Sequence, residues 1–592
     1  MKRFRTILTA ALLLAACLPA AALDRKAFSI TQCKLQIDLD QTHHALAATG
    51  AIEVRNNSPQ PQISLVLQIS SSLEWKRVTI GENEVEWLSD LYTSDIDHTG
   101  ALTEIVIQLP EAIPQGGTVT LGVSYGGPIE ASAERLVRIG TPVKTALRSD
   151  WDRLSDDFSA MRGIGYVVWY PVETDAASLS NGTEVFDTLA AWKPRQAQME
   201  VTFRWPAGEE KSAGMNLVTN GEQRGTAEGQ TKGLRSASVV FPAGEVPVVV
   251  FGPLISLPRE KLVVFHSEPH TQVARDYALA LEKDVPIIEE WFGGLKRKVV
   301  IVELADPDAL PFESGAFLFT PLQPLPDLAL ETALARVTTH AAFSSPRPWI
   351  SDGLAAFAQA LVRERQAGRR AALNYLNEFA DALVSADRPG QKADPAEDAP
   401  TLTAQPLTQT HDDLFFRTKA AFVWWMLRDM VGDENLRAAL RSYNGMNDHE
   451  PGYMQRLIES RLEAGRSLEQ FFDDWVYRDR GLPDFAIAAV NTRQTLGGEY
   501  VIAVTVENLG DPWCEVPVVL RAPAGERSQR VVVPGHGKAI VRISFHGLPE
   551  KVVVNDGSVP ESDVSNNAAT IEAPAPTKPH EDLPNPPSKH RK

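Results

Sequence analysis

The sequence predicts a multidomain protein with a large N-terminal all-β domain, a central α/β domain that is mostly helical, and a C-terminal β-sandwich. Three observations lead to this fold class. Residues 23–255 carry short alternating or apolar runs separated by Gly, Pro and Asn turns, which is typical of strands. Residues 256–485 mix such strands with long helical patterns. Strand patterns return over residues 486–572, at a spacing that suits a sandwich of about 90 residues.

Length and composition agree with a folded protein of several domains. The chain has 592 residues, of which 43% are hydrophobic and 23% charged, and these values exclude a chain that is disordered throughout. The net charge of −18 argues against nucleic acid as a partner. Beyond the N-terminus, no apolar run approaches the roughly 20 residues that span a bilayer.

The first 22 residues are typical of an export signal. Lys2, Arg3 and Arg5 precede an apolar stretch too short for a transmembrane helix. Two endings stay open. Residues 14–17 resemble a lipoprotein signal in which Cys17 is acylated, whereas residues 20–22 suit ordinary signal peptidase. We therefore expect an exported protein, either a periplasmic or outer-membrane lipoprotein attached to the membrane by lipid, or a free and possibly secreted form.

Each predicted domain contains clear element patterns. The strongest strand patterns are Lys34–Leu39, Thr118–Val123, Leu262–Phe265, Lys298–Val302, Tyr500–Val506 and Lys551–Val554. A helical pattern covers Val273–Trp291. Residues 387–413 are rich in Pro, Thr, Gln and Asp and are expected to form an exposed loop. The Pro- and Lys-rich residues 573–592 are expected to be disordered.

The central region contains four sequence fragments whose order along the chain is informative. They are Glu313–Phe319, Thr338–Phe343 with Trp349–Ala355, Arg417–Arg428, and Phe471–Arg478 with Gly481–Phe485. Together they resemble the aminopeptidase N and leukotriene-A hydrolase family of zinc metallopeptidases. The resemblance implies an N-terminal β saddle and a thermolysin-like domain over residues 256–485. Residues 554–567 resemble the end of bacterial cell-adhesion-related β-sandwiches, which implies an immunoglobulin-like C-terminal domain whose acidic residues could bind Ca²⁺ or simply form a turn.

The first fragment corresponds to the family's edge strand, which lines the substrate groove. The resemblance therefore implies that Gly315, Ala316, Phe317 and Leu318 line a groove here. Leu318 stands where a carboxylate would bind the α-ammonium group of a peptide, and an alkyl side chain offers that group no charge partner.

The second fragment lacks most of the family's zinc motif, His-Glu-x-x-His followed by a Glu on the next helix. If His340 is the first histidine, Ala341 and Ser344 replace the Glu and the second histidine. If His340 is the second, Arg336 and Val337 replace the first histidine and the Glu. Both registers leave only His340 and Asp352 as residual metal candidates.

Three further interpretations concern single residues of this region. Arg417 stands where the family has a tyrosine that donates a hydrogen bond to the tetrahedral intermediate. Arg417 could instead pair with Asp352 and replace the charge of the lost metal. The simpler alternatives are that His340 is a hydrogen-bonded core residue and that Asp352 favours the N-terminus of a helix beginning at Gly353.

These observations predict a metal-free relative of the family, with no cofactor and no catalytic residues. Its expected role is binding of a peptide, protein or cell-envelope ligand, or scaffolding in the envelope. The alternative is an active aminopeptidase-like metallopeptidase whose zinc site is rebuilt from residues such as His411, Asp412 or Asp413. A purely structural protein whose groove has closed is a third possibility.

Overall fold

The computed structural model describes residues 23–206, 215–228, 234–387, 405–411, 413–495, 497–523 and 525–572. The export signal with Cys17, and the tail 573–592, lie outside these residues. The chain forms two compact units. Unit 1 comprises residues 1–279 and 298–324, and unit 2 comprises residues 280–297 and 325–592.

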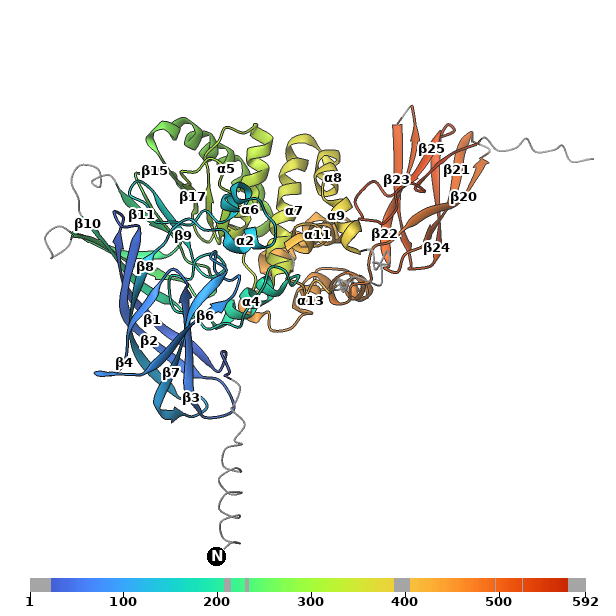
Figure 1. Cartoon of the computed structure of the whole chain (residues 1–592). Coiled ribbons are helices and arrows are strands. Elements are labelled where there is room, and N and C mark those ends of the chain that lie inside the picture. Colours follow the sequence, from blue (N-terminus) through green and yellow to red (C-terminus); the bar gives the residue numbers. More distant parts are fainter. Residues whose placement is uncertain are drawn as a thin grey trace, which may run out of the picture. The chain divides into compact units, whose positions relative to one another are not determined.

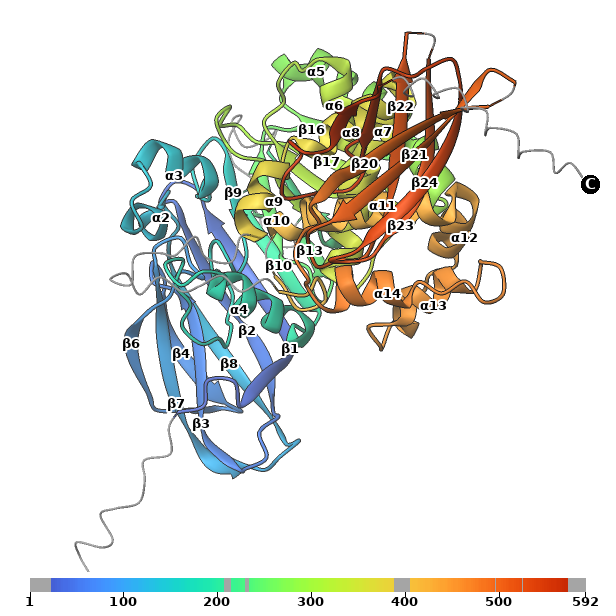
Figure 2. The ribbon, with the colours of Figure 1, turned by 90° about the vertical axis from the view of Figure 1, so that its right-hand side faces the viewer.

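Unit 1 is built mainly on an eight-stranded sheet (Figures 1 and 2). In spatial order its strands are β12 (Glu222–Glu228), β13 (Leu234–Phe241), β10 (Met199–Pro206), β1 (Phe28–Asp40), β2 (Ala45–Asn56), β8 (Thr118–Pro128), β4 (Glu74–Ile80) and β5 (Asn83–Glu84). The β1–β10 pair is parallel, and the other neighbours in this sheet are antiparallel. Alternating burial along β1, with Leu35, Ile37 and Leu39 inside, confirms the strand that the period of two predicts.

Two smaller sheets complete the N-terminal part of unit 1. They are β3 (Gln62–Ser70), β7 (Ala101–Ile113) and β6 (Trp87–Thr93), and β11 (Asn216–Thr219), β14 (Val248–Gly252) and β9 (Ser159–Arg162). This region also contains three short helices that the all-β prediction did not include: α2 (Glu134–Arg138), α3 (Val143–Ser149) and α4 (Glu184–Trp192). They are short, and in the sequence they lie between strand patterns.

A five-stranded sheet forms the remainder of unit 1. Its order is β15 (Ile255–Pro258), β16 (Leu262–His266), β17 (Val299–Glu303), β19 (Phe317–Thr320) and β18 (Phe312–Ser314). Strands β16, β17 and β19 run parallel. Helix α5 (Thr271–Phe292) connects β16 to β17, as expected for a parallel crossover, and confirms the predicted helix.

Unit 2 contains helices followed by two packed sheets (Figure 2). The helices are α6 (Asp327–Ala342), α7 (Pro348–Ala367), α8 (Arg369–Asn377), α9 (Ala380–Asp387), α10 (Asp413–Arg417), α11 (Lys419–Val431), α12 (Asp433–Ser442), α13 (Tyr453–Glu459) and α14 (Glu469–Phe472), with a π-helical turn over Asp473–Tyr477. The sheets are β20 (Phe485–Gln494), β21 (Glu499–Asn508) and β24 (Lys538–His546), and β23 (Gly525–Val533), β22 (Cys514–Ala522), β25 (Lys551–Val554) and β26 (Ala568–Thr570).

The two sheets of the sandwich share one hydrophobic core with the helices. Residues of α7 and α11 and residues of β21 and β22 belong to a single buried cluster. Trp475 donates a hydrogen bond to the carbonyl of Trp513, 3.0 Å away, and Trp513 N–H donates to Asp474 at 2.8 Å. The sandwich is therefore built into unit 2. The two units cut across the predicted domain 256–485, because its sheet belongs to unit 1 and most of its helices to unit 2.

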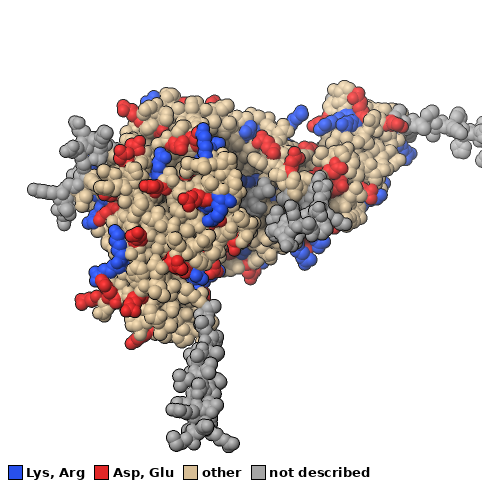
Figure 3. Space-filling view, in the orientation of Figure 1, with Lys and Arg blue, Asp and Glu red and all other residues tan. Residues whose placement is uncertain are grey.

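In the described part of the chain, no helix is both long enough and apolar enough to cross a membrane. On the face shown in Figure 3, acidic and basic side chains are interspersed. Cys33 and Cys514 are buried free thiols.

Candidate functional site

The candidate site lies on two neighbouring helices of unit 2. Helix α6 carries Arg336 and His340, which are four residues apart and therefore on one face. Helix α7 carries Asp352 in its second turn. Pro348 occupies the first position of α7, where proline suits a helix start. The expectation that the helix begins at Gly353 is therefore wrong, and Asp352 is not a capping residue.

Both side chains of α6 reach the same carboxylate oxygen of α7. Arg336 Nη2 lies 2.6 Å from Asp352 Oδ1, and His340 Nε2 lies 3.8 Å from the same atom. His340 Nδ1 is 3.5 Å from the hydroxyl of Ser351. The exposed fractions of the Arg336, His340 and Asp352 side chains are 11%, 15% and 29%. His340 is thus a largely buried, hydrogen-bonded histidine beside a charged pair.

Arg336 is the site residue whose role the sequence analysis missed. The expectation paired Asp352 with Arg417, but among the ion pairs of the described residues Asp352 is joined to Arg336 and His340, and none joins it to Arg417. Arg417 is the exposed last residue of α10. The available signal was spacing, because Arg336 lies four residues before His340 and therefore shares its helix face.

Positive charge also gathers near Tyr375 of α8. Burial raises the pKa of the Tyr375 hydroxyl, and the guanidinium groups of Arg363, Arg336 and Arg417 act in the opposite direction. The guanidinium of Arg363 lies 5.3 Å from the centre of the Tyr375 ring. Arg417 and Arg336 therefore act electrostatically on the same tyrosine, although Asp352 forms its ion pair with Arg336.

These residues do not fit a catalytic zinc. Such a site needs three protein ligands that each donate an electron pair, and an open position for water. A guanidinium has five N–H donors and no lone pair to give, so Arg336 repels a cation at the point where a third ligand would stand. The described residues also contain no group of three or more His, Cys, Asp or Glu side chains that could hold a metal. Asp412 and the side chain of Asp413 lie outside the described residues, so the rebuilt site stays a prediction.

The predicted groove residues all belong to unit 1. Gly315, with φ of +57°, and Ala316 form the tight turn between β18 and β19, while Phe317 and Leu318 begin β19. The edge strand of this sheet is β18, so β19 is one strand further in than the family resemblance implies. Leu318 is only 6% exposed and pairs in register with Glu313. An alkyl side chain with so little exposure gives an ammonium group no charge partner.

The helices of the candidate site are tightly fixed by their neighbours. The ring of Trp349 on α7 stacks on Trp424 of α11, with centroids 5.2 Å apart and planes inclined by 10°. Gly353 permits this approach, because a Cβ there would lie 2.7 Å from the Cβ of Ala420. Lys419 is fully buried in an ion pair with Asp479. The backbone around Asp352 is therefore held rigidly by packing.

A second titratable group is found at the C-terminal ends of β16 and β17 in unit 1. Glu303, 4% exposed, accepts hydrogen bonds from Ser267 N and Oγ, at 2.6 and 3.0 Å, and pairs with His270 Nδ1. Ser267 Oγ and the Glu303 carboxylate both contact Nδ1 of His270. In a catalytic triad the hydroxyl and the carboxylate contact opposite nitrogens of the histidine ring. This cluster ties the start of α5 to the sheet.

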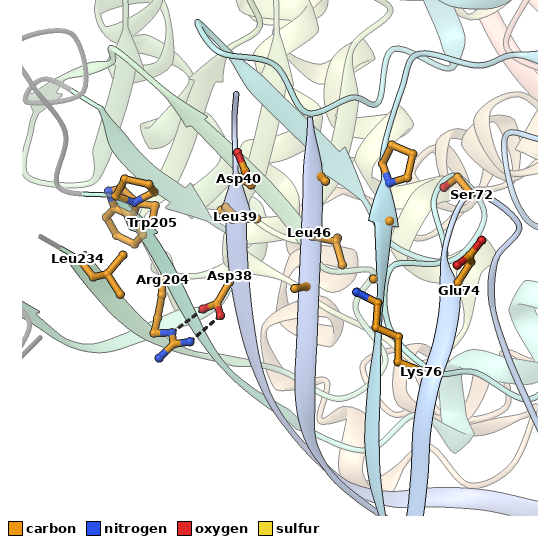
Figure 4. A pocket seen from close by; sticks show the side chains of 16 residues that line it. Asp38, Leu39, Asp40, Leu46, Ser72, Glu74, Lys76, Arg204, Trp205 and Leu234 are labelled. Atoms are coloured by element: carbon orange, nitrogen blue, oxygen red, sulfur yellow. Dashed lines mark hydrogen bonds and ion pairs between the residues drawn. The ribbon is translucent and has the colours of Figure 1, made fainter. Parts of the chain in front are cut away.

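A large groove also crosses the eight-stranded sheet of unit 1 (Figure 4). It encloses about 690 Å³, and its lining includes the small residues Ala45, Ala47 and Gly126. The Asp38–Arg204 ion pair lines one side, and Glu74 and Lys76 line the other. None of the predicted site residues lines this groove.

Comparisons with known proteins agree with the fold. No family model and no curated protein matches the chain. Among solved structures, aminopeptidase A of Legionella pneumophila in complex with aspartic acid matches with a TM-score of 0.58 and 15% identity, over 90% of this chain but only 59% of that chain. The M1 zinc metallopeptidase of Deinococcus radiodurans matches over 77% of this chain and 95% of its own, with a TM-score of 0.47 and 17% identity. At the level of the fold, the chain is therefore similar to aminopeptidase A of Legionella pneumophila.

Proposed function

We propose that this chain is an exported protein with an aminopeptidase fold that has lost the catalytic zinc and peptidase activity, and that it acts as a binding or scaffold protein of the cell envelope. The observation that carries the proposal is the ion pair between Arg336 and Asp352. A permanent cation from the protein itself stands beside the carboxylate that would otherwise ligate the metal.

The geometry favours the register in which His340 is the second histidine of the former motif. In that register Arg336, His340 and Asp352 occupy the three ligand positions, and these are the three side chains that meet at one oxygen atom. Val337 then stands at the position of the general base. A valine cannot accept a proton from a bound water, so the family's hydrolytic step has no base here.

The retained contacts are those that hold the helices. Trp349, Gly353 and Lys419 keep their packing roles, while Arg336 and Val337 are unsuited to the ligand and general-base roles of their positions. Retention of the packing residues beside replacement of the chemical ones supports a role of the folded scaffold in binding. A groove lined by residues 315–318 and an envelope location, with or without a lipid on Cys17, are parts of the same proposal.

The test is the zinc content of the purified mature protein after incubation with Zn²⁺ and desalting. We expect less than about 0.1 equivalent, because a two-ligand site beside a guanidinium binds zinc weakly. Amino-acid anilides should not be hydrolysed. The triple variant Arg336→His, Val337→Glu, Asp352→Glu removes the guanidinium and restores a three-ligand set, and it should retain more zinc than the wild type.

The control is Arg365→His, which adds a histidine to the exposed part of α7 far from Asp352 in sequence and should leave the zinc content unchanged. Close to one equivalent in the wild type, lost on His340→Ala and accompanied by anilide hydrolysis, would overturn the proposal. That result would favour the active metallopeptidase with a rebuilt site.

A further inference from the structure

A pocket of about 400 Å³ lies inside unit 2, where the last helices before the loop face the sandwich. Asn377 and Asp381 of α8 and α9 form one wall, and Arg521 and Lys551 of β22 and β25 line another part. Buried residues of the turn after β25 form its floor. The volume lies in the range of small-molecule sites. Arg336, His340 and Asp352 do not line this pocket.

One wall of the pocket carries two positive charges in direct opposition. Arg521 and Lys551 are register partners on neighbouring antiparallel strands, so both side chains stand on the same sheet face. Like charges placed directly opposite each other destabilise a sheet. Arg521 has a partial partner in Glu526, 3.4 Å away, but within the described residues no ion pair involves Lys551. An anion bound between the two side chains would remove this repulsion.

The floor carries the opposite charge, in a buried setting. Glu561 is 6% exposed, and its carboxylate accepts hydrogen bonds from Asn555, Asn567 and the backbone N–H of Phe485. Among the described residues it has no basic partner. Burial raises its pKa to about 7, and the negative charge of Asp484 acts in the same direction. A cationic group would stabilise this carboxylate.

The floor also holds an unused hydrogen-bond acceptor. Asn567 is 6% exposed, and its Oδ1 atom has no donor within the described part of the chain. Its Nδ2 atom donates to Glu561 at 2.5 Å, so the free amide oxygen lies next to the carboxylate. A buried acceptor without a donor costs roughly 1–3 kcal/mol. A primary ammonium group supplies three N–H donors and one positive charge, and so satisfies both groups.

We propose that this pocket binds a small zwitterion of amino-acid to dipeptide size, with its ammonium group at Glu561 and Asn567 and its carboxylate at Lys551 and Arg521. Aliphatic residues also line the pocket, which suits an aliphatic side chain on the ligand. These residues are Ala380, Val384, Val553, Val559, Val564 and Ala568. The site is independent of the proposed loss of zinc chemistry and stands whether or not α6 and α7 hold a metal.

The test is calorimetric titration of the full-length mature protein with L-leucine and L-alanyl-L-leucine. At least one should bind saturably, and its N-acetyl and its amide derivatives should each bind at least about tenfold more weakly, because each lacks one charge. Lys551→Gln should weaken binding by a similar factor. Lys551 is exposed, so this change should leave the fold intact.

The matched control is Lys538→Gln on β24, an exposed lysine of the other sheet, which should bind like the wild type. Glu561→Gln keeps the shape of the floor and removes its charge, and its unfolding temperature shows whether any loss of binding reflects misfolding. No saturable binding up to about 10 mM, or equal binding of the blocked derivatives, would overturn the proposal. Unchanged affinity in Lys551→Gln would do the same.

Discussion

Removing the charge of Arg336 should reveal how much its ion pair with Asp352 contributes to the free energy of unfolding. With a contact of 2.6 Å between Nη2 and Oδ1, the charge centres are about 4 Å apart, and an effective dielectric constant of about 20 gives an attraction of about 4 kcal/mol. Desolvation offsets part of this. We therefore expect Arg336→Gln and Asp352→Asn each to lower the free energy of unfolding by about 2–4 kcal/mol, since each leaves one mostly buried charge without its partner.

The double variant should lose less than the sum of the two single variants. The expected coupling energy is about 1–3 kcal/mol. Urea unfolding followed by tryptophan fluorescence reports on both units, because buried tryptophans such as Trp349 and Trp169 lie in the core of each. Hydrogen exchange of the α6 and α7 amides gives a local reading. Arg456→Gln, which breaks an exposed pair with Glu450 in the same unit, is the control and should cost less than about 1 kcal/mol.

A coupling energy within about 0.5 kcal/mol of zero would refute the reasoning. It would mean that Arg336 stabilises α6 by packing alone and that its charge does not substitute for a metal at Asp352. Faster exchange in the control variant, with no change at α6 and α7 in Arg336→Gln, would lead to the same conclusion.

Three more predictions concern buried groups of unit 2. Burial raises the pKa of Asp284 to about 9, and neither of its carboxylate oxygens has a hydrogen-bond partner in the described part of the chain. Between its unfolded pKa near 4 and this value the folded protein holds a proton that the unfolded chain has released, so this group makes stability fall by up to about 1.4 kcal/mol per pH unit as pH rises. Asp284→Asn should flatten that dependence in unfolding temperatures measured from pH 5 to 10; parallel curves for the two proteins would contradict it. Gly353→Ala brings a Cβ to 2.7 Å from the Cβ of Ala420 and should cost about 1–3 kcal/mol of unfolding free energy, whereas Gly294→Ala meets nothing within 4 Å and should cost less. Lys419→Met leaves a buried carboxylate without its cation and should lower the free energy of unfolding by about 3–5 kcal/mol; a thermal transition unchanged from wild type would show that this ion pair contributes no net stability.

Short apolar or alternating runs predicted many strands correctly, since strands bury apolar side chains on one or both faces. The patterns at Lys34–Leu39, Thr118–Val123 and Lys551–Val554 fall within β1, β8 and β25. The helix over Val273–Trp291 lies within α5 because its apolar positions follow the helical repeat. Short helices such as α2 were missed, because five residues are too few to display such a period.

The chemistry of the site was only partly readable from the sequence. The absence of one motif histidine and of the general base was visible as residue types at known spacing around His340. The sequence analysis paired Asp352 with Arg417, because that pairing rested on the family resemblance, and only the packing of α6 against α7 shows that Arg336 holds Asp352. Likewise, the opposition of Arg521 and Lys551 depends on strand register, and no local pattern reports that register.

The sequence by itself therefore determined the element types, the β–helical–β order and the absence of a complete His-Glu-x-x-His motif, since these depend on local periodicity and residue identity. Tertiary structure alone decided which charges meet. It decided that Arg336 reaches Asp352, that Glu561 is buried without a basic partner among the described residues, and that the sandwich shares its core with the helices. Contacts between residues far apart in the chain depend on how whole elements pack, and side-chain electrostatics follow from that packing.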